Sequence, residues 1–115
     1  MSDFGKLLTA VITPFDNNGV LNTDTLWRLC KKLVHEKSDG LVLSGTTGES
    51  PNLTKEDRKI IYSTAKDSVG DKAKIIAGTG TYSTKESIEY TKMANDIGVD
   101  GIMIVTPYYS KPSQF

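Results

Sequence analysis

The sequence predicts an α/β fold built on a parallel sheet. Short apolar segments alternate with longer amphipathic ones in the order β-α-β-α-β-α-β. The predicted strands begin roughly 30 residues apart, which is the length of one strand–helix–strand unit. Each interval therefore leaves room for a crossover helix, which returns the next strand in the same direction as the last.

The first part of the chain supplies two strands and one helix. The apolar run at residues 7–13 ends at a proline and a turn-forming Asp-Asn-Asn-Gly sequence, as a strand does. Residues 23–37 carry apolar side chains at helical spacing on one face and charged ones on the other. Residues 40–44 form a continuous apolar run, which is typical of a strand buried on both faces.

The second part of the chain repeats this unit. A helix is expected over residues 55–69, because Thr54 is a natural N-cap with an aspartate three residues later. A third strand is expected at residues 75–77. A Ser-x-x-Glu sequence then opens a helix over residues 83–97, a glycine closes it, and residues 101–105 form a fourth strand.

Two architectures fit this order: an open doubly wound sheet, or part of a (β/α)₈ barrel. A complete barrel takes about 250 residues, so a chain of 115 residues supplies a little under four of its eight units. We expect one domain over residues 1–115 and no second one. Both architectures collect functional groups at the carboxyl ends of the strands, which directs attention to the loops at 45–50, 78–82 and 106–110.

Composition excludes several classes of function. Fourteen Lys and Arg residues balance fourteen Asp and Glu residues, so no basic surface for nucleic acid or an anionic membrane is expected. A single cysteine and a single histidine argue against a disulfide framework and against a metal site. No apolar run approaches a membrane span and no signal peptide is recognisable, so we expect a soluble, cytoplasmic protein.

The loop at residues 45–50 carries the clearest chemical signal. In Gly-Thr-Thr-Gly-Glu the glycines let backbone N–H groups approach an anion, and the hydroxyls of Thr46 and Thr47 can bind a carboxylate or pass a proton. The alternative is a plain turn whose threonines cap the following backbone. The loop is neither a P-loop nor a Gly-x-Gly-x-x-Gly fingerprint.

The other two loops are weaker signals. The glycines of Gly-Thr-Gly at 78–80 indicate sharp turning or backbone clearance more than chemistry. Tyr108 and Tyr109 cannot both point into one core, so at least one phenol is expected to face a cleft or a partner, where it can relay protons. The alternative is aromatic packing, which suits Tyr108 better than Tyr109.

Three other conspicuous residues have ordinary explanations. His35 lies near the end of the first helix, where a cation interacts favourably with the terminal carbonyls. Cys30 falls on the apolar stripe and is expected to be a buried small hydrophobe. Trp27 is expected to cover the core from the same helix.

Four segments occur together in the order and spacing of one family, and they cover essentially the whole chain. On these segments the chain resembles the dihydrodipicolinate synthases, which are class I aldolases related to N-acetylneuraminate lyase. The threonine at the second position of Gly-Thr-Thr-Gly-Glu, where the sialic acid lyases usually carry serine, and the sequence Tyr-Tyr-Ser-Lys-Pro-Ser-Gln favour the lysine-pathway synthases over those lyases. The segments are Ala-Val-Ile-Thr-Pro-Phe at 10–15, Gly-Thr-Thr-Gly-Glu-Ser at 45–50, Ile-Ala-Gly-Thr-Gly at 76–80 and Val-Thr-Pro-Tyr-Tyr at 105–109.

The resemblance implies a (β/α)₈ barrel, with this chain covering about the first four strands. It implies a Schiff-base condensation of pyruvate with aspartate-4-semialdehyde in lysine biosynthesis, without a cofactor. Thr46 and Thr47 match the residues that contact the pyruvate carboxylate, and Thr47 also matches the central hydroxyl of a Tyr–Thr–Tyr proton relay. Tyr109 matches the relay tyrosine that reaches the neighbouring subunit of a homo-oligomer, which is expected to be a dimer of dimers.

The same resemblance places the Schiff-base lysine, the second relay tyrosine and the substrate-binding arginine beyond residue 115. We therefore expect these 115 residues alone to be inactive, as a truncated or incomplete copy of a longer enzyme. Three alternatives stay open: another pyruvate-dependent class I aldolase, a non-catalytic half-barrel fragment that binds small carboxylates or oligomerises, and an open flavodoxin-like phosphate-binding domain.

Some family members are inhibited by lysine at a dimer-interface site, and several positions here match it. Lysine is a cation, so extra cations beside that pocket should repel it, and we expect weak or absent inhibition. Ser50, Glu86 and Tyr108 match the site, Lys55 and Arg58 replace histidines of the inhibited forms, and Tyr82 replaces an asparagine.

Overall fold

The computed structural model describes residues 3–113, so the last residue of Tyr-Tyr-Ser-Lys-Pro-Ser-Gln lies outside the described part. The predicted alternation of strands and helices is confirmed. Two single-turn 3₁₀ helices, Ser50–Asn52 and Gly70–Lys72, flank α2. The strands are β1 (Leu8–Ala10), β2 (Gly40–Leu43), β3 (Lys74–Gly78) and β4 (Gly101–Met103), and the helices are α1 (Thr23–His35), α2 (Lys55–Val69) and α3 (Thr84–Ile97).

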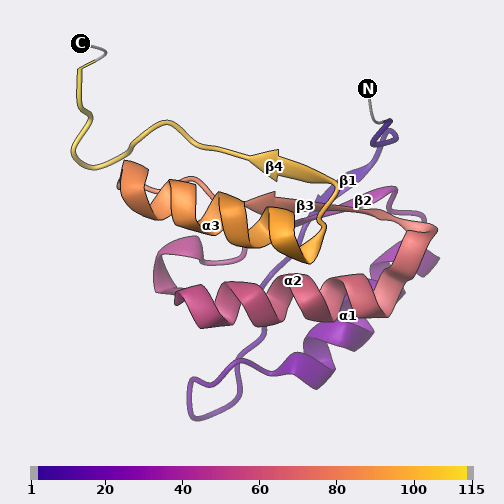
Figure 1. Ribbon diagram of the computed structural model, residues 1–115. Helices are drawn as coiled ribbons and strands as arrows, with labels where there is room; N and C mark the ends of the chain where they lie inside the picture. Colours follow the sequence, from indigo (N-terminus) through magenta and orange to yellow (C-terminus); the bar gives the residue numbers. More distant parts are fainter. Residues whose placement is uncertain (1–2, 114–115) are drawn as a thin grey trace.

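The four strands form one parallel sheet in the order β1-β2-β3-β4. All three helices lie on the same side of this sheet, as Figure 1 shows. A doubly wound sheet would carry helices on both faces and reverse its strand order at a switch point. Consecutive neighbours with every helix on one side are instead the arrangement of successive units of a (β/α)₈ barrel.

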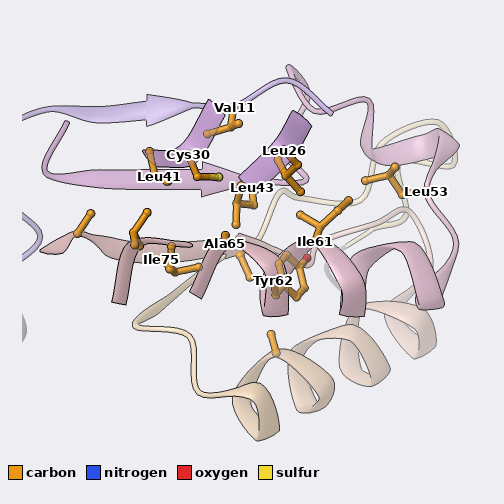
Figure 2. Close-up of a cluster of buried hydrophobic side chains, with 14 residues drawn as sticks. Val11, Leu26, Cys30, Leu41, Leu43, Leu53, Ile61, Tyr62, Ala65 and Ile75 are labelled. Carbon is orange, nitrogen blue, oxygen red and sulfur yellow. The ribbon is translucent and has the colours of Figure 1, made fainter. Parts of the chain in front are cut away.

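The core lies between the sheet and the helices (Figure 2). Each strand alternates its side chains, so every second residue faces the helices. Cys30 is completely buried, as expected for a small hydrophobe, and burial raises the pKa of its thiol to about 11. The central buried side chains are Leu41, Leu43 and Ile75 from the strands, Leu26 and Cys30 from α1, and Ile61, Tyr62 and Ala65 from α2.

The opposite face of the sheet is apolar and partly uncovered. Register places Ala10, Val42, Ile76 and Gly101 side by side on this face. Val42 is only half-buried, so β2 is not enclosed on both faces within this chain, contrary to the prediction. In a barrel this face points to the interior, where side chains from the other strands fill the space.

The outer strands are shorter than their apolar runs predict. β1 and β4 lie at the edges of this sheet and each has one neighbour, so their ladders extend only as far as that neighbour pairs with them. The capping box of α2 forms as predicted between Thr54 and Asp57. The box predicted for α3 is half-formed: the Ser83 hydroxyl accepts from the Glu86 N–H at 3.3 Å, while the Glu86 carboxylate accepts from another residue.

Gly98 and His35 lie where the sequence predicts them, whereas Trp27 does not. Gly98 ends α3 in the left-handed conformation, with φ of 91°. His35 lies exposed in the last turn of α1. Trp27 is only half-buried, and its indole N–H donates to the Asp67 carboxylate on α2 at 3.2 Å, so it bridges the two helices at the surface and does not cover the core.

Candidate functional site

A cavity of about 240 Å³ opens at the carboxyl ends of β2, β3 and β4. All three loops that the sequence analysis singled out contribute to its wall. The lining residues are Ser44, Gly45, Thr46, Ser50 and Pro51 after β2, Gly78 at the end of β3 and Gly80 after it, and Met103 at the end of β4 with Val105 and Tyr108 after it.

The loop after β2 is closed by its own backbone. The Glu49 N–H donates to the Thr46 carbonyl at 3.0 Å, and the Ser50 N–H donates to the Gly45 carbonyl at 3.2 Å. Glu49 has a φ of 58°, a left-handed conformation that costs free energy for a residue with a side chain. The loop is thus a compact turn whose shape depends on where Ser50 is held.

This turn presents the two threonine hydroxyls differently. Thr46 lines the cavity, whereas Thr47 lies exposed at the tip of the turn. Within residues 3–113 neither hydroxyl takes part in a hydrogen bond, so the plain turn with capping threonines is not what forms. Both hydroxyls are therefore available to an anionic ligand.

The glycines of β3 provide clearance between backbones, as the sequence indicated. A Cβ atom on Gly78 would lie 2.6 Å from the Ser44 carbonyl oxygen. A Cβ atom on Gly80 would lie 2.4 Å from the backbone nitrogen of Val105. The absence of side chains lets the ends of β2, β3 and β4 converge on the cavity.

A buried polar network lies behind the cavity, and sequence reasoning missed it. The Tyr62 hydroxyl is paired with the Ser44 hydroxyl and donates to the Gly78 carbonyl at 3.1 Å. Arg58 Nη1 donates to the same carbonyl at 2.9 Å. Arg58 and Tyr62 are four residues apart on α2, on the same face as Ala65, so their position on the buried stripe was the available signal.

Three tyrosines gather at the mouth of the cavity. The Tyr82 ring lies 5.6 Å from the Tyr108 ring and 6.3 Å from the Tyr109 ring, measured between centroids. Tyr108 is half-buried and lines the cavity, while Tyr109 is 89% exposed with a φ of 64°. One phenol therefore faces the cavity and the other faces outward.

Most of the positions matched to a regulatory site lie at or next to the cavity, and Arg58 donates two hydrogen bonds to Ser50. Ser50 and Tyr108 line the cavity, and Tyr82 contacts Tyr108. Lys55 lines a separate groove between α2 and α3 and is not among the residues that line the cavity.

Arg58 is only 2% exposed and is not a free surface cation. Glu86 accepts a hydrogen bond from the Tyr90 hydroxyl at 3.4 Å, and Arg58 stacks on the Tyr90 ring. Burial, together with the negative charge of Glu86, raises the pKa of Tyr90. These three residues thus form an internal cluster between α2 and α3.

The described residues contain neither a candidate metal site nor a candidate membrane span. Among residues 3–113, no three His, Cys, Asp or Glu side chains are grouped so that they could hold a metal ion. None of the described helices combines the length and the apolar character needed to cross a bilayer.

Comparison with known proteins matches this geometry to one family. The model of the dihydrodipicolinate synthetase family matches residues 3–115. A 4-hydroxy-tetrahydrodipicolinate synthase from Desulforudis audaxviator is 53% identical over 112 residues, which cover 97% of this chain and 38% of that relative. The chain therefore spans well under half the length of the curated relative.

Solved structures agree with the sequence comparison. A dihydrodipicolinate synthase from Bacillus anthracis superposes with a TM-score of 0.94 at 44% identity, covering 99% of this chain and 39% of that one. A dihydrodipicolinate synthase from Cyanidioschyzon merolae, solved with lysine bound, gives a TM-score of 0.92 at 40% identity, covering 96% and 38%. By fold, sequence and the convergence of its strand-end loops, the chain belongs to the dihydrodipicolinate synthetase family.

Proposed function

We propose that this chain forms the pyruvate-binding part of a 4-hydroxy-tetrahydrodipicolinate synthase, a lyase of lysine biosynthesis. The reaction would condense pyruvate with aspartate-4-semialdehyde through a Schiff base. The observation that carries the proposal is the single cavity at the strand ends, with an unpaired Thr46 hydroxyl in its wall and an unpaired Thr47 hydroxyl beside it. Membership of the dihydrodipicolinate synthetase family supports pyruvate as the source of the carboxylate that such hydroxyls would bind.

The two threonines and Tyr109 take separate roles in this proposal. Thr46 and Thr47 donate hydrogen bonds to the pyruvate carboxylate, which accepts from several donors at once. Thr47 also passes a proton to or from the Tyr109 hydroxyl that a neighbouring subunit supplies, as both groups can donate and accept.

The Schiff-base nucleophile has no counterpart in the described residues. Lys74 is the only half-buried lysine among them and lies at the amino end of β3, away from the cavity, while the other lysines are exposed. A Schiff-base lysine requires burial or a cationic neighbour to lower its pKa. Residues 1–115 alone are therefore expected not to catalyse the condensation.

The proposal also includes how the subunits assemble and where in the cell the enzyme acts. Tyr109 is 89% exposed, so its phenol is free to enter the active site of a neighbouring subunit. The catalytic unit would then be a dimer, and a dimer of dimers would contain two such units. We propose that the enzyme acts in the cytoplasm.

A chimera tests this function. Residues of this chain replace the matching 112-residue segment of the Desulforudis audaxviator relative, which provides the remainder of a barrel. We expect turnover of pyruvate and aspartate-4-semialdehyde, and we expect Thr47→Val to lower kcat/KM by about 100-fold or more. Thr84→Val, at an exposed position on α3, is the matched control and should change nothing. A folded chimera without turnover would contradict the proposal.

A further inference from the structure

Arg58 is a buried cation whose charge no carboxylate neutralises. Its side chain is 2% exposed, and the only ion pair among residues 3–113 joins Arg28 to Asp24. Removing an unpaired charge from water is costly unless strong hydrogen bonds replace the lost hydration. The contacts that hold this guanidinium therefore indicate what it does.

Those contacts join two walls of the cavity. Arg58 Nη2 donates to the Ser50 carbonyl at 3.0 Å and to the Ser50 hydroxyl at 2.8 Å. Arg58 Nη1 donates to the Gly78 carbonyl at 2.9 Å. Ser50 ends the loop after β2 and Gly78 ends β3, so one guanidinium connects the carboxyl ends of two neighbouring strands.

The third contact of the guanidinium is with an aromatic ring. Its central carbon lies 4.3 Å from the centroid of the Tyr90 ring on α3. A planar fork that stacks on an aromatic ring while it donates along two directions is a geometry that arginine provides and lysine does not. Arg58 thus contacts the loop after β2, the end of β3 and helix α3 at the same time.

We propose that Arg58 is a positioning residue that holds the loop at 45–50, and with it Thr46 and Thr47, against the end of β3. It acts through Ser50, whose N–H closes the loop onto Gly45 at 3.2 Å. Arg58 is not among the residues that line the cavity, so it would act on a ligand there through Ser50. The inference rests on the proposed function, because it assigns the held threonines to pyruvate.

Kinetics of the chimera described above test this role. In Arg58→Met the loop loses two hydrogen bonds and the end of β3 loses one. We expect the KM for pyruvate to rise about tenfold, because small misplacements of binding groups have effects of this size or larger. The KM for aspartate-4-semialdehyde should stay within twofold or so. Arg58→Lys, which keeps the charge and one donor direction, should give an intermediate KM for pyruvate and is the variant to use if Arg58→Met does not fold.

Arg28→Met is the matched control, since it removes an arginine that is exposed on α1. It should leave both KM values unchanged. A purely structural role of Arg58 would lower the folded fraction, and so the apparent kcat, while both KM values stayed constant. That result would overturn the proposal.

Hydrogen exchange separates this proposal from the proposed function, because it needs no activity. The amides of Glu49 and Ser50 should exchange about tenfold faster in Arg58→Met than in the parent chimera, and as slowly as in the parent in Arg28→Met. Unchanged exchange of these two amides would refute the positioning role even in an active enzyme. If these two amides exchange faster in Arg58→Met but the parent chimera is inactive, the positioning role of Arg58 is supported and the proposed function is contradicted.

Discussion

The contact between the ends of β2 and β3 gives a prediction whose size follows from the structure. A Cβ atom on Gly78 would meet three backbone atoms of β2 and its continuation, at 2.6, 3.0 and 3.1 Å. Backbone atoms of paired strands cannot turn aside as a side-chain tip can. We therefore expect Gly78→Ala to destabilise the fold by about 3 kcal/mol, the upper part of the range for overpacking.

Gly45→Ala is the matched control at the same cavity. Its Cβ atom would meet the terminal methyl group of Met103 at 3.2 Å, and a methionine side chain adapts easily. We expect a cost below about 1 kcal/mol.

Thermal unfolding of the chimera measures both variants. For a protein of its size, a loss of about 3 kcal/mol lowers Tm by roughly 6–12 °C, and the control should lower it by less than about 4 °C. Equal shifts for Gly78→Ala and Gly45→Ala would refute the account of how β2 and β3 converge.

Three further predictions concern single side chains. Tyr62→Phe removes one buried hydroxyl and should lower the free energy of unfolding by about 1 kcal/mol in denaturant titrations, with no loss expected for Tyr82→Phe at the surface. Tyr109→Phe should leave Tm unchanged and lower kcat by about 100-fold, and full activity would exclude Tyr109 from the relay. The thiol of Cys30, with its pKa raised from 9.0 to about 11, is protonated in the fold up to a higher pH than in the unfolded chain. The free energy of unfolding should therefore fall as pH rises from 9.0 to about 11, with a slope that is smaller in Cys30→Ala, and an identical slope would contradict this.

Regulation by lysine gives a fourth prediction. We expect submillimolar lysine to leave the chimera active, because Arg58 already occupies both the carbonyl and the hydroxyl of Ser50. The sequence alone predicts the same outcome for another reason, which is repulsion of lysine by two extra cations, Lys55 and Arg58, beside the pocket. Strong inhibition by submillimolar lysine in an activity titration would contradict this prediction, because it would show that the hydrogen bonds from Arg58 to Ser50 do not prevent lysine from binding.

Periodicity and capping residues were enough to predict the three α-helices and the four strands, but not the two single-turn 3₁₀ helices. The reason is local: an apolar stripe, an N-cap such as Thr54 and a closing glycine such as Gly98 act within a few residues of themselves. The ends of β1 and β4 were predicted less well, because a ladder stops where the neighbouring strand stops pairing, which no local pattern records.

The candidate site was also predicted only where local sequence patterns or a general rule of the fold apply. The loops that line the cavity follow from the rule that parallel strands end at one edge of the sheet. The role of Arg58 did not follow, because charged residues are rarely buried and its acceptors lie 8 and 20 residues away. The burial of such a group depends on carbonyls that only the folded chain brings together.

The location of bound pyruvate tests the central claim most directly. In a crystal structure of the chimera treated with pyruvate and borohydride, the trapped carboxylate should lie about 3 Å from the hydroxyl or backbone N–H groups of Thr46 and Thr47. A trapped carboxylate held by other residues, with the loop at 45–50 empty, would contradict the account.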